Sequence, residues 1–157
     1  MTQSGDDPMD QYSEAAARPS PRGLATILSL CPRANSSKPG RSLLVVWDQR
    51  KPLMPEFANA YSYVVTFDQK WVAAGNHFHR QKAEIFFAIQ GEMTLIVQNH
   101  EQCIEEEIRL NPNEGVHIRA GLAHAVFAES PGAILLVLAS HPNNKEDEFP
   151  LRIWDSE

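Results

Sequence analysis

The sequence contains few cysteines and no long apolar segment. The two cysteines among its 157 residues, Cys31 and Cys103, are too few for a disulfide framework and lack the paired spacing of a zinc knuckle or a redox motif. No stretch approaches the roughly twenty apolar residues that a membrane span requires. The N-terminal segment is acidic where a secretory signal would be basic and then apolar. We therefore expect a cytoplasmic protein without a membrane partner.

Basic residues are in the minority. The chain has 14 Lys and Arg against 20 Asp and Glu, a formal charge of −6, which argues against a surface that neutralises nucleic-acid phosphates. Hydrophobic residues make up 43% of the chain, enough for one packed domain of this length. The expected partners are a small-molecule substrate, with no nucleic acid, and a second copy of the chain in a homodimer.

Large apolar residues are scarce in the first forty positions. This segment holds five of the eleven prolines, together with Ser, Gly, Asp and Asn. Because so little apolar surface cannot offset chain entropy, residues 1–40 are expected to form a disordered or arm-like extension, and residues 41–157 the domain. Within the extension, the run 23–30 is apolar enough to dock as an added strand or a helical turn, before Cys31-Pro32 interrupts it.

From about Ser42 onward, the sequence favours strand after strand. The segments are rich in β-branched and aromatic residues and are separated by turns such as Gly91-Glu92 and 111–115. No segment has a sustained helical period, so the pattern predicts an all-β sandwich or barrel of antiparallel strands. Glu105, Glu106 and Glu107 are expected on a solvated edge. The expected strands are 43–47, 62–67, 85–89, 93–97, 116–118, 124–127 and 133–139.

Two of the six histidines stand one residue apart in strand-like sequence. Residues i and i+2 of a strand share a face, so His77 and His79 can grip one ion. Glu84 begins the next strand, and His124 opens a later one after a glycine turn. Three imidazoles and a carboxylate would suit a divalent transition metal such as Fe, Mn, Ni, Co, Cu or Zn. The alternative is that the histidines are hydrogen-bonded or face solvent without an ion.

The spacing around these residues resembles the cupin superfamily. The run GNHFH at 75–79, followed by Glu84 and Gly91, resembles the first cupin signature, and AGLAH at 120–124 resembles the second. This resemblance implies the cupin double-stranded β-helix, a jelly-roll barrel, with a metal on His77, His79, Glu84 and His124.

Two positions depart from the cupin pattern. Trp71 stands where the family has a glycine six residues before His77, and Arg119 stands where it has a proline two residues before Gly121. Neither departure removes a ligand. An arginine near the mouth of the barrel is a candidate anion contact.

A narrower likeness is to small cupins that act on nucleotide-linked 4-keto sugars. These include 3,4-ketoisomerases and the epimerising cupin domain of some capsular sugar reductases. That resemblance implies no metal for ketoisomerases, a non-ligating residue at position 84 and an aromatic residue at 124; this chain keeps Glu84 and His124. It therefore lies nearer a metal-retaining branch, or cupins outside sugar metabolism. The residues that carry this resemblance are Arg41-Ser42-Leu43, Trp47, Pro52, Pro55, Tyr61, Tyr63, Gly75 and the segments 138–142 and 146–148.

The preferred interpretation is an isomerase or epimerase acting on a nucleotide-linked keto sugar. Such a reaction moves a proton next to a carbonyl while a Lewis acid or a hydrogen-bond donor holds the oxyanion. Tyr63 is the candidate acid or base, and Arg119 the candidate contact for pyrophosphate. The alternatives are that Tyr63 fills the barrel and that Arg119 is a surface residue.

Two other functions use the same residues. An iron held by three His and one Glu could support a cupin dioxygenase, and a barrel without catalysis could bind a small ligand. Of the remaining histidines, His100 is expected in solvent, His117 hydrogen-bonded and partly buried, and His141 at the end of a strand.

Overall fold

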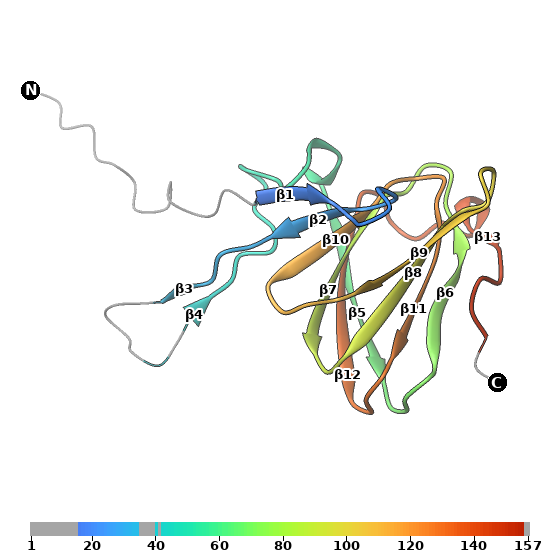
Figure 1. Ribbon diagram of the computed structural model, residues 1–157. Helices are drawn as coiled ribbons and strands as arrows, with labels where there is room; N and C mark the ends of the chain where they lie inside the picture. Colours follow the sequence, from blue (N-terminus) through green and yellow to red (C-terminus); the bar gives the residue numbers. More distant parts are fainter. Residues whose placement is uncertain (1–15, 35–39, 41, 156–157) are drawn as a thin grey trace, which may run out of the picture.

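Two antiparallel β-sheets packed face to face make up the body of the protein (Figure 1). The computed structural model describes residues 16–34, 40 and 42–155. The prediction of an all-β jelly-roll barrel is confirmed. The strands are β1 (Ala16–Pro19), β2 (Thr26–Ser29), β3 (Arg33–Ala34), β4 (Ser42–Leu43), β5 (Tyr61–Phe67), β6 (Ala73–Phe78), β7 (Glu84–Gln90), β8 (Met93–Asn99), β9 (Ile104–Arg109), β10 (Glu114–Ile118), β11 (Ala123–Ala128), β12 (Ala133–Ala139) and β13 (Phe149–Pro150).

Strand order places sequence neighbours in different sheets. One sheet runs β1-β2-β10-β7-β12-β5 and the other β13-β6-β11-β8-β9. Consecutive strands β6 and β7 therefore lie in opposite sheets, as do β10 and β11 and also β11 and β12. Because the chain crosses repeatedly between the sheets, residues from β5, β6, β7 and β11 can meet in the space between them.

The core lies between the two sheets, where alternate side chains of each strand point inward. Phe86, Leu95, Val126 and Leu135 belong to this layer and are at most 3% exposed. A smaller cluster lies on the outer face of the six-stranded sheet. There the loop between β4 and β5, with the 3₁₀ turn η1 (Pro55–Phe57), places the fully buried Phe57 against a patch that includes Leu28, Ile85, Phe87 and Leu138. Both faces of β7 and β12 are thus covered, which explains their continuously apolar sequences.

The N-terminal segment adds two strands to the six-stranded sheet. β2 pairs with β10 and β1 pairs with β2, so the apolar run 23–30 contains a strand. β2 belongs to the sheet although it lies before residue 40, the boundary predicted from composition between the extension and the domain. The boundary itself stays a prediction. The short ribbon β3–β4 extends away from the barrel (Figure 1). The extension predicted for residues 1–15 and 35–39 lies outside the described residues.

Glu106 corrects one expectation about the edge of the barrel. It was expected in solvent, but it is 4% exposed. Its carboxylate accepts hydrogen bonds from the Ser20 hydroxyl at 2.7 Å and from the backbone N–H of Arg22 at 2.8 Å. The physical reason is that the turn between β1 and β2 folds over β9 and brings its donors to this carboxylate. Glu106 therefore anchors the N-terminal segment.

Trp71, which stands where the cupin pattern has a glycine, adopts a backbone conformation that glycine favours. Its φ of 65° lies in the left-handed region that glycine adopts without strain. Its backbone N–H donates to the carbonyl of Ala128 at 2.7 Å, and its ring lies 5.7 Å from that of Phe127. These contacts hold a large side chain in an unfavourable backbone conformation.

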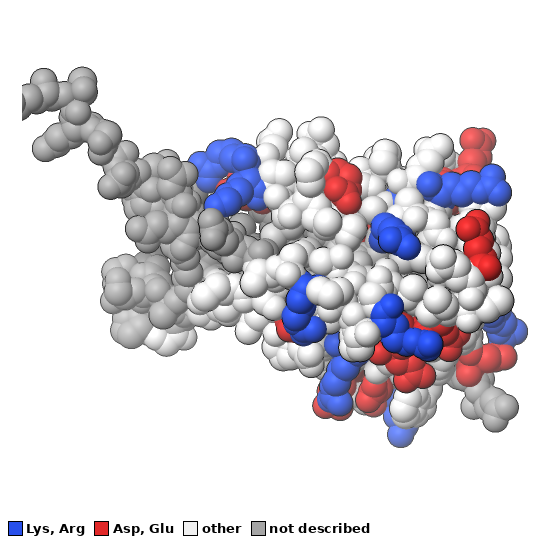
Figure 2. Space-filling view, turned by 45° about the horizontal axis from the view of Figure 1, so that its top comes forward, with Lys and Arg blue, Asp and Glu red and all other residues white. Residues whose placement is uncertain are grey.

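Charged residues are mixed on the surface. Figure 2 shows Lys and Arg interspersed with Asp and Glu over the visible face. Within the described part of the chain, no helix has the length and apolar character needed to cross a membrane.

Candidate metal and substrate site

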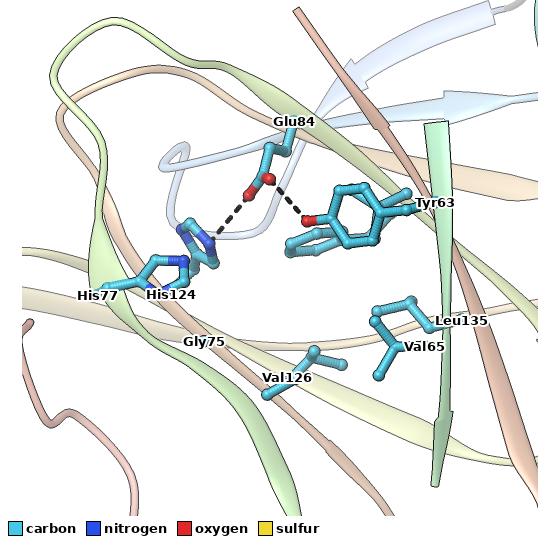
Figure 3. A pocket seen from close by; sticks show the side chains of 11 residues that line it. Tyr63, Val65, Gly75, His77, Glu84, His124, Val126 and Leu135 are labelled. Carbon is cyan, nitrogen blue, oxygen red and sulfur yellow. Dashed lines mark hydrogen bonds and ion pairs between the residues drawn. The ribbon is translucent and has the colours of Figure 1, made fainter. Parts of the chain in front are cut away.

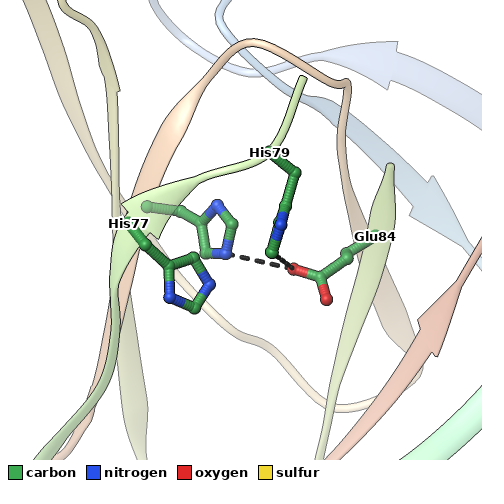
Figure 4. Close-up of side chains that lie close together, drawn as sticks. His77, His79 and Glu84 are labelled. Atoms are coloured by element: carbon green, nitrogen blue, oxygen red, sulfur yellow. Dashed lines mark ion pairs between the residues drawn. The ribbon is translucent and has the colours of Figure 1, made fainter. Parts of the chain in front are cut away.

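Strands from both sheets bring the candidate ligands to one end of the barrel. His77 lies on β6, and His79 follows that strand directly. His124 lies on β11, opposite His77 in the β6–β11 pair. Glu84 begins β7 in the other sheet and points toward the histidines (Figure 4). The structure thus places the four residues singled out from the sequence side by side.

A glycine permits the close approach of β6 and β11. Gly75 has a φ of +98°, and a Cβ at this position would lie 2.7 Å from the carbonyl oxygen of His124. The pairing register shifts between His124 and Ala125, as in a β-bulge. The glycine of the GNHFH run therefore lets the two histidine-bearing strands meet at the site.

The potential ligand atoms form a compact, buried group. One atom from each of the four residues lies within 4.8 Å of every other. The Nε2 atoms of His124 and His79 lie 3.0 and 3.9 Å from Oε2 of Glu84. Glu84, His79 and His124 are 2%, 3% and 4% exposed, and the side chain of His77 is 20% exposed. His77 is thus the most accessible member of the cluster.

The cluster has the properties of an ion-binding site. Nε2 of His79 and Oε2 of Glu84 are buried, and neither has a hydrogen-bond partner among the described residues. Burial and the neighbouring histidines lower the pKa of His77 to about 4, and burial lowers that of His79. Burial alone would raise the pKa of Glu84, but His124, Lys82 and His79 lower it below its usual range. Neutral imidazoles and an ionised carboxylate are the forms that bind metals, so the residues fit a divalent ion.

The C-terminal segment orients His79. Nδ1 of His79 lies 2.8 Å from the carbonyl oxygen of Asp147, in the 3₁₀ turn η2 (Lys145–Asp147). Because a carbonyl only accepts, Nδ1 carries the proton, which leaves Nε2 for the cluster. The Asp147 carboxylate also accepts backbone N–H groups from Arg80, Gln81 and Lys82 at 3.0 to 3.1 Å. Asp147 was not identified from the sequence, because nothing local connects it to a histidine 68 residues away.

A cavity of about 180 Å³ opens beside the cluster (Figure 3). Tyr63, on β5, lies in its wall and donates a hydrogen bond from its hydroxyl to Oε1 of Glu84 at 2.9 Å. Burial and the Glu84 charge raise the pKa of Tyr63 far above its usual value, so the phenol stays protonated. Polar groups gather at one end, and the other walls are apolar. The lining residues are Tyr63, Val65, Ala74, Gly75, His77, Glu84, Phe86, His124, Val126, Leu135 and Val137.

Lys82 is a second polar neighbour of Glu84 that sequence reasoning missed. It is 6% exposed, and its Nζ lies 3.1 Å from Oε1 of Glu84. It also donates to Oδ1 of Asn143 at 3.0 Å. A lysine in a loop is ordinarily read as solvated, so only the fold reveals this ion pair.

The other singled-out residues lie apart from the cluster. Arg119 is exposed after β10 and is not part of the cavity wall formed by the described residues. The Gly121 N–H, two residues later, donates to the His79 carbonyl at 2.6 Å, so this loop lies at the histidine end of the barrel. His117 is buried on β10, where its Nε2 lies 3.2 Å from Oε1 of Glu56. His100 packs on the ring of Phe78, and Nδ1 of His141 lies 2.9 Å from the Ser140 hydroxyl.

Comparison with known proteins gives a family match over most of the chain. The family described as FdtA: WxcM-like, C-terminal, matches residues 27–150. The chain belongs to this family. No match was found among curated proteins.

Solved structures share the fold of this WxcM-like protein. A 3,4-ketoisomerase from Helicobacter canadensis has 22% identity and a TM-score of 0.68, covering 80% of this chain and 89% of its own. A mutant 3,4-ketoisomerase QdtA from Thermoanaerobacterium thermosaccharolyticum, in complex with TDP-4-keto-6-deoxyglucose, has 18% identity and a TM-score of 0.65, covering 80% and 86%. The rmlC epimerase of Mycobacterium tuberculosis has 16% identity and a TM-score of 0.67, covering 85% and 71%. At these identities the likeness establishes the cupin fold.

Proposed function

We propose that this protein is an isomerase or epimerase that acts on a nucleotide-linked keto sugar by proton transfer next to the carbonyl. The observation that carries the proposal is the cavity in which the Tyr63 hydroxyl, the Glu84 carboxylate and the histidines face one small space. Membership of the WxcM-like family supports it, as do structural neighbours described as ketoisomerases and epimerases of TDP-linked sugars.

The size of the cavity limits what it encloses. Its volume of about 180 Å³ is below the roughly 300–1,000 Å³ of sites that enclose drug-sized ligands. A single sugar ring would therefore enter, and the nucleotide would lie outside at the mouth. Arg119, exposed on the loop that contacts His79, is the proposed partner of the pyrophosphate.

The chain's own residues supply the proton chemistry. Tyr63 stays protonated, so on substrate binding its single O–H would turn from Oε1 of Glu84 and donate to the oxyanion or carbanion that develops beside it. His77 is the most exposed histidine of the cluster and has a pKa of about 4, so at neutral pH its imidazole is neutral, which is the form that binds a metal. Glu84 stays ionised, and its Oε1 accepts the Tyr63 hydroxyl at the cavity wall before substrate binds. Apolar walls exclude water from the reacting carbon.

A divalent transition metal is part of the proposal. His77, His79, Glu84 and His124 would hold it through atoms that lie within 4.8 Å of one another. Bound there, a metal would supply Lewis acidity that polarises the ketone.

Metal-dependent oxygenation is the second candidate function. It is favoured by the set of three histidines and one glutamate beside apolar cavity walls. Within this set, Nε2 of His79 and Oε2 of Glu84 are buried without a hydrogen-bond partner among the described residues. Substrate-dependent oxygen uptake by iron-loaded protein would establish it. Tight ligand retention without turnover would instead indicate a binding protein.

The proposed isomerisation is tested by hydrogen exchange. Protein purified without chelator is analysed for metals and incubated in D₂O with a panel of keto sugar nucleotides. We expect deuterium at a sugar carbon without oxygen consumption. We expect Tyr63→Phe to lose the exchange, whereas Tyr61→Phe, an exposed tyrosine on the same strand, keeps it. No exchange with any member of the panel would contradict the proposal.

We also propose that the protein forms a homodimer in the cytoplasm. Val64 and Ile89, on β5 and β7, are large apolar residues that are 57% and 54% exposed, and exposed apolar surface commonly marks an interface. Both cysteines are free and exposed, which fits a reducing compartment. Sedimentation of the wild type and of Val64→Glu tests the dimer: the wild type should sediment as a dimer and the variant as a monomer.

A further inference from the structure

The two oxygens of Glu84 have different surroundings. Oε1 accepts a hydrogen bond from the Tyr63 hydroxyl at 2.9 Å and lies 3.1 Å from Nζ of Lys82. Oε2 has no hydrogen-bond partner in the described part of the chain and faces Nε2 of His124 and His79. Because each carboxylate oxygen has about two lone pairs, Oε1 is fully engaged, whereas, among the described residues, Oε2 faces only the histidines, 3.0 and 3.9 Å from Nε2 of His124 and His79.

Lys82 is held at two points by the C-terminal segment. Its backbone N–H donates to Oδ2 of Asp147 at 3.1 Å, and its Nζ donates to Oδ1 of Asn143 at 3.0 Å. The side chain is 6% exposed. A lysine fixed at backbone and ammonium in this way acts as a rigid donor rather than a mobile surface charge.

Because the two oxygens of Glu84 differ in their surroundings, we propose that Lys82 is a positioning residue for the metal site. With Tyr63 it occupies Oε1 of Glu84, so the carboxylate offers a single oxygen to the cluster. The inference rests on the proposed function, because it assumes that the cluster binds an ion.

This arrangement has two consequences for a bound ion. A carboxylate that binds through one oxygen leaves one more coordination position free for an oxygen of the substrate. The ammonium charge beside the carboxylate also opposes the positive ion and weakens its binding. Lys82 thus keeps the site open at the expense of metal affinity.

The test compares Mn²⁺ binding by wild type, Lys82→Met and, as a matched control, Lys70→Met at an exposed lysine. Calorimetry gives the dissociation constants, and crystal structures without metal give the carboxylate orientation. We expect Lys82→Met to bind Mn²⁺ at least tenfold more tightly, with the Glu84 carboxylate shifted toward the histidines. Lys70→Met should match the wild type.

The outcomes separate this inference from the proposed function. If Lys82 had only a structural role, Lys82→Met would bind Mn²⁺ as tightly as the wild type or more weakly, because a loosened site does not gain affinity. That result, together with an unmoved Glu84 carboxylate, would overturn the proposed role of Lys82. If the wild type binds none of Mn²⁺, Co²⁺ and Zn²⁺, the metal part of the proposed function fails, and the crystal structures still decide whether Lys82 orients Glu84. If Lys82→Met does not fold, the same measurements on Lys82→Gln decide.

Discussion

The hydroxyl of Tyr63 donates to one oxygen of Glu84 at 2.9 Å, while the other oxygen of that carboxylate faces the histidine cluster. The buried carboxylate of Glu84 therefore contacts both the proposed proton donor, Tyr63, and the histidines of the proposed metal site. A change at Glu84 reaches both the ion and the phenol, which makes this residue the most informative position for mutation.

Glu84→Gln should lose metal and stability together. The variant removes the charge that balances Lys82, and leaving a buried charge without its partner costs about 3–5 kcal/mol. Elemental analysis and urea unfolding measure the two effects. Glu92→Gln is the control, because the Glu92 side chain is 60% exposed and surface changes usually stay within about 0.5 kcal/mol. Full metal content in Glu84→Gln would show that the carboxylate is not a ligand.

The metal-free protein should lose stability as the pH falls from neutral toward 4. The pKa of His77 is lowered from 6.5 to about 4 by burial and by neighbouring histidines. The unfolded chain therefore binds more protons than the folded one in this window, so the stabilisation is complete above pH 6.5 and is lost as the pH falls to 4. Urea unfolding at several pH values measures the slope. His77→Asn should flatten it, and an unchanged slope would argue against a buried neutral His77.

Gly75→Ala should disrupt the pairing of β6 with β11. The new Cβ would lie 2.7 Å from the carbonyl oxygen of His124, at a φ of +98°. Left-handed strain alone costs about 1–3 kcal/mol, and the clash adds to it. Gly23→Ala is the matched control, because Gly23 also has a positive φ, but a Cβ added there would meet no atom within 4 Å beyond its chain neighbours. Thermal unfolding should show a larger loss for Gly75→Ala, together with weaker metal binding.

Asp147→Asn should loosen the segment that follows His79. The carboxylate accepts three backbone N–H groups, and hydrogen bonds to a charged group contribute about 1.5–3 kcal/mol each. The asparagine keeps one acceptor oxygen, so we expect a loss of about 1–3 kcal/mol and faster amide exchange at residues 80–82. Glu146→Gln, an exposed neighbour in η2, should leave both unchanged. Equal exchange in the two variants would contradict this role.

Local sequence patterns predicted most of the strands and the cluster. The alternation and turn residues between Ser42 and Ala139 indicated β-strands because a side-chain period of two is a property of one strand and needs no partner. His77 and His79 were recognised for the same reason, and Gly75 marks the close approach that the pair requires. Glu106 was misjudged because its donors come from the distant turn at Ser20 and Arg22.

The sequence by itself determined an all-β cupin barrel and the four residues that gather at one end of it. Its periodicity and motif spacing carry that information locally. Only the tertiary structure decided that Lys82 and Tyr63 share Oε1 of Glu84, that Asp147 orients His79, and that Arg119 lies outside the cavity. These relationships depend on how loops and the C-terminal segment pack against the barrel, and long-range packing has no signature in the spacing of residues along one chain.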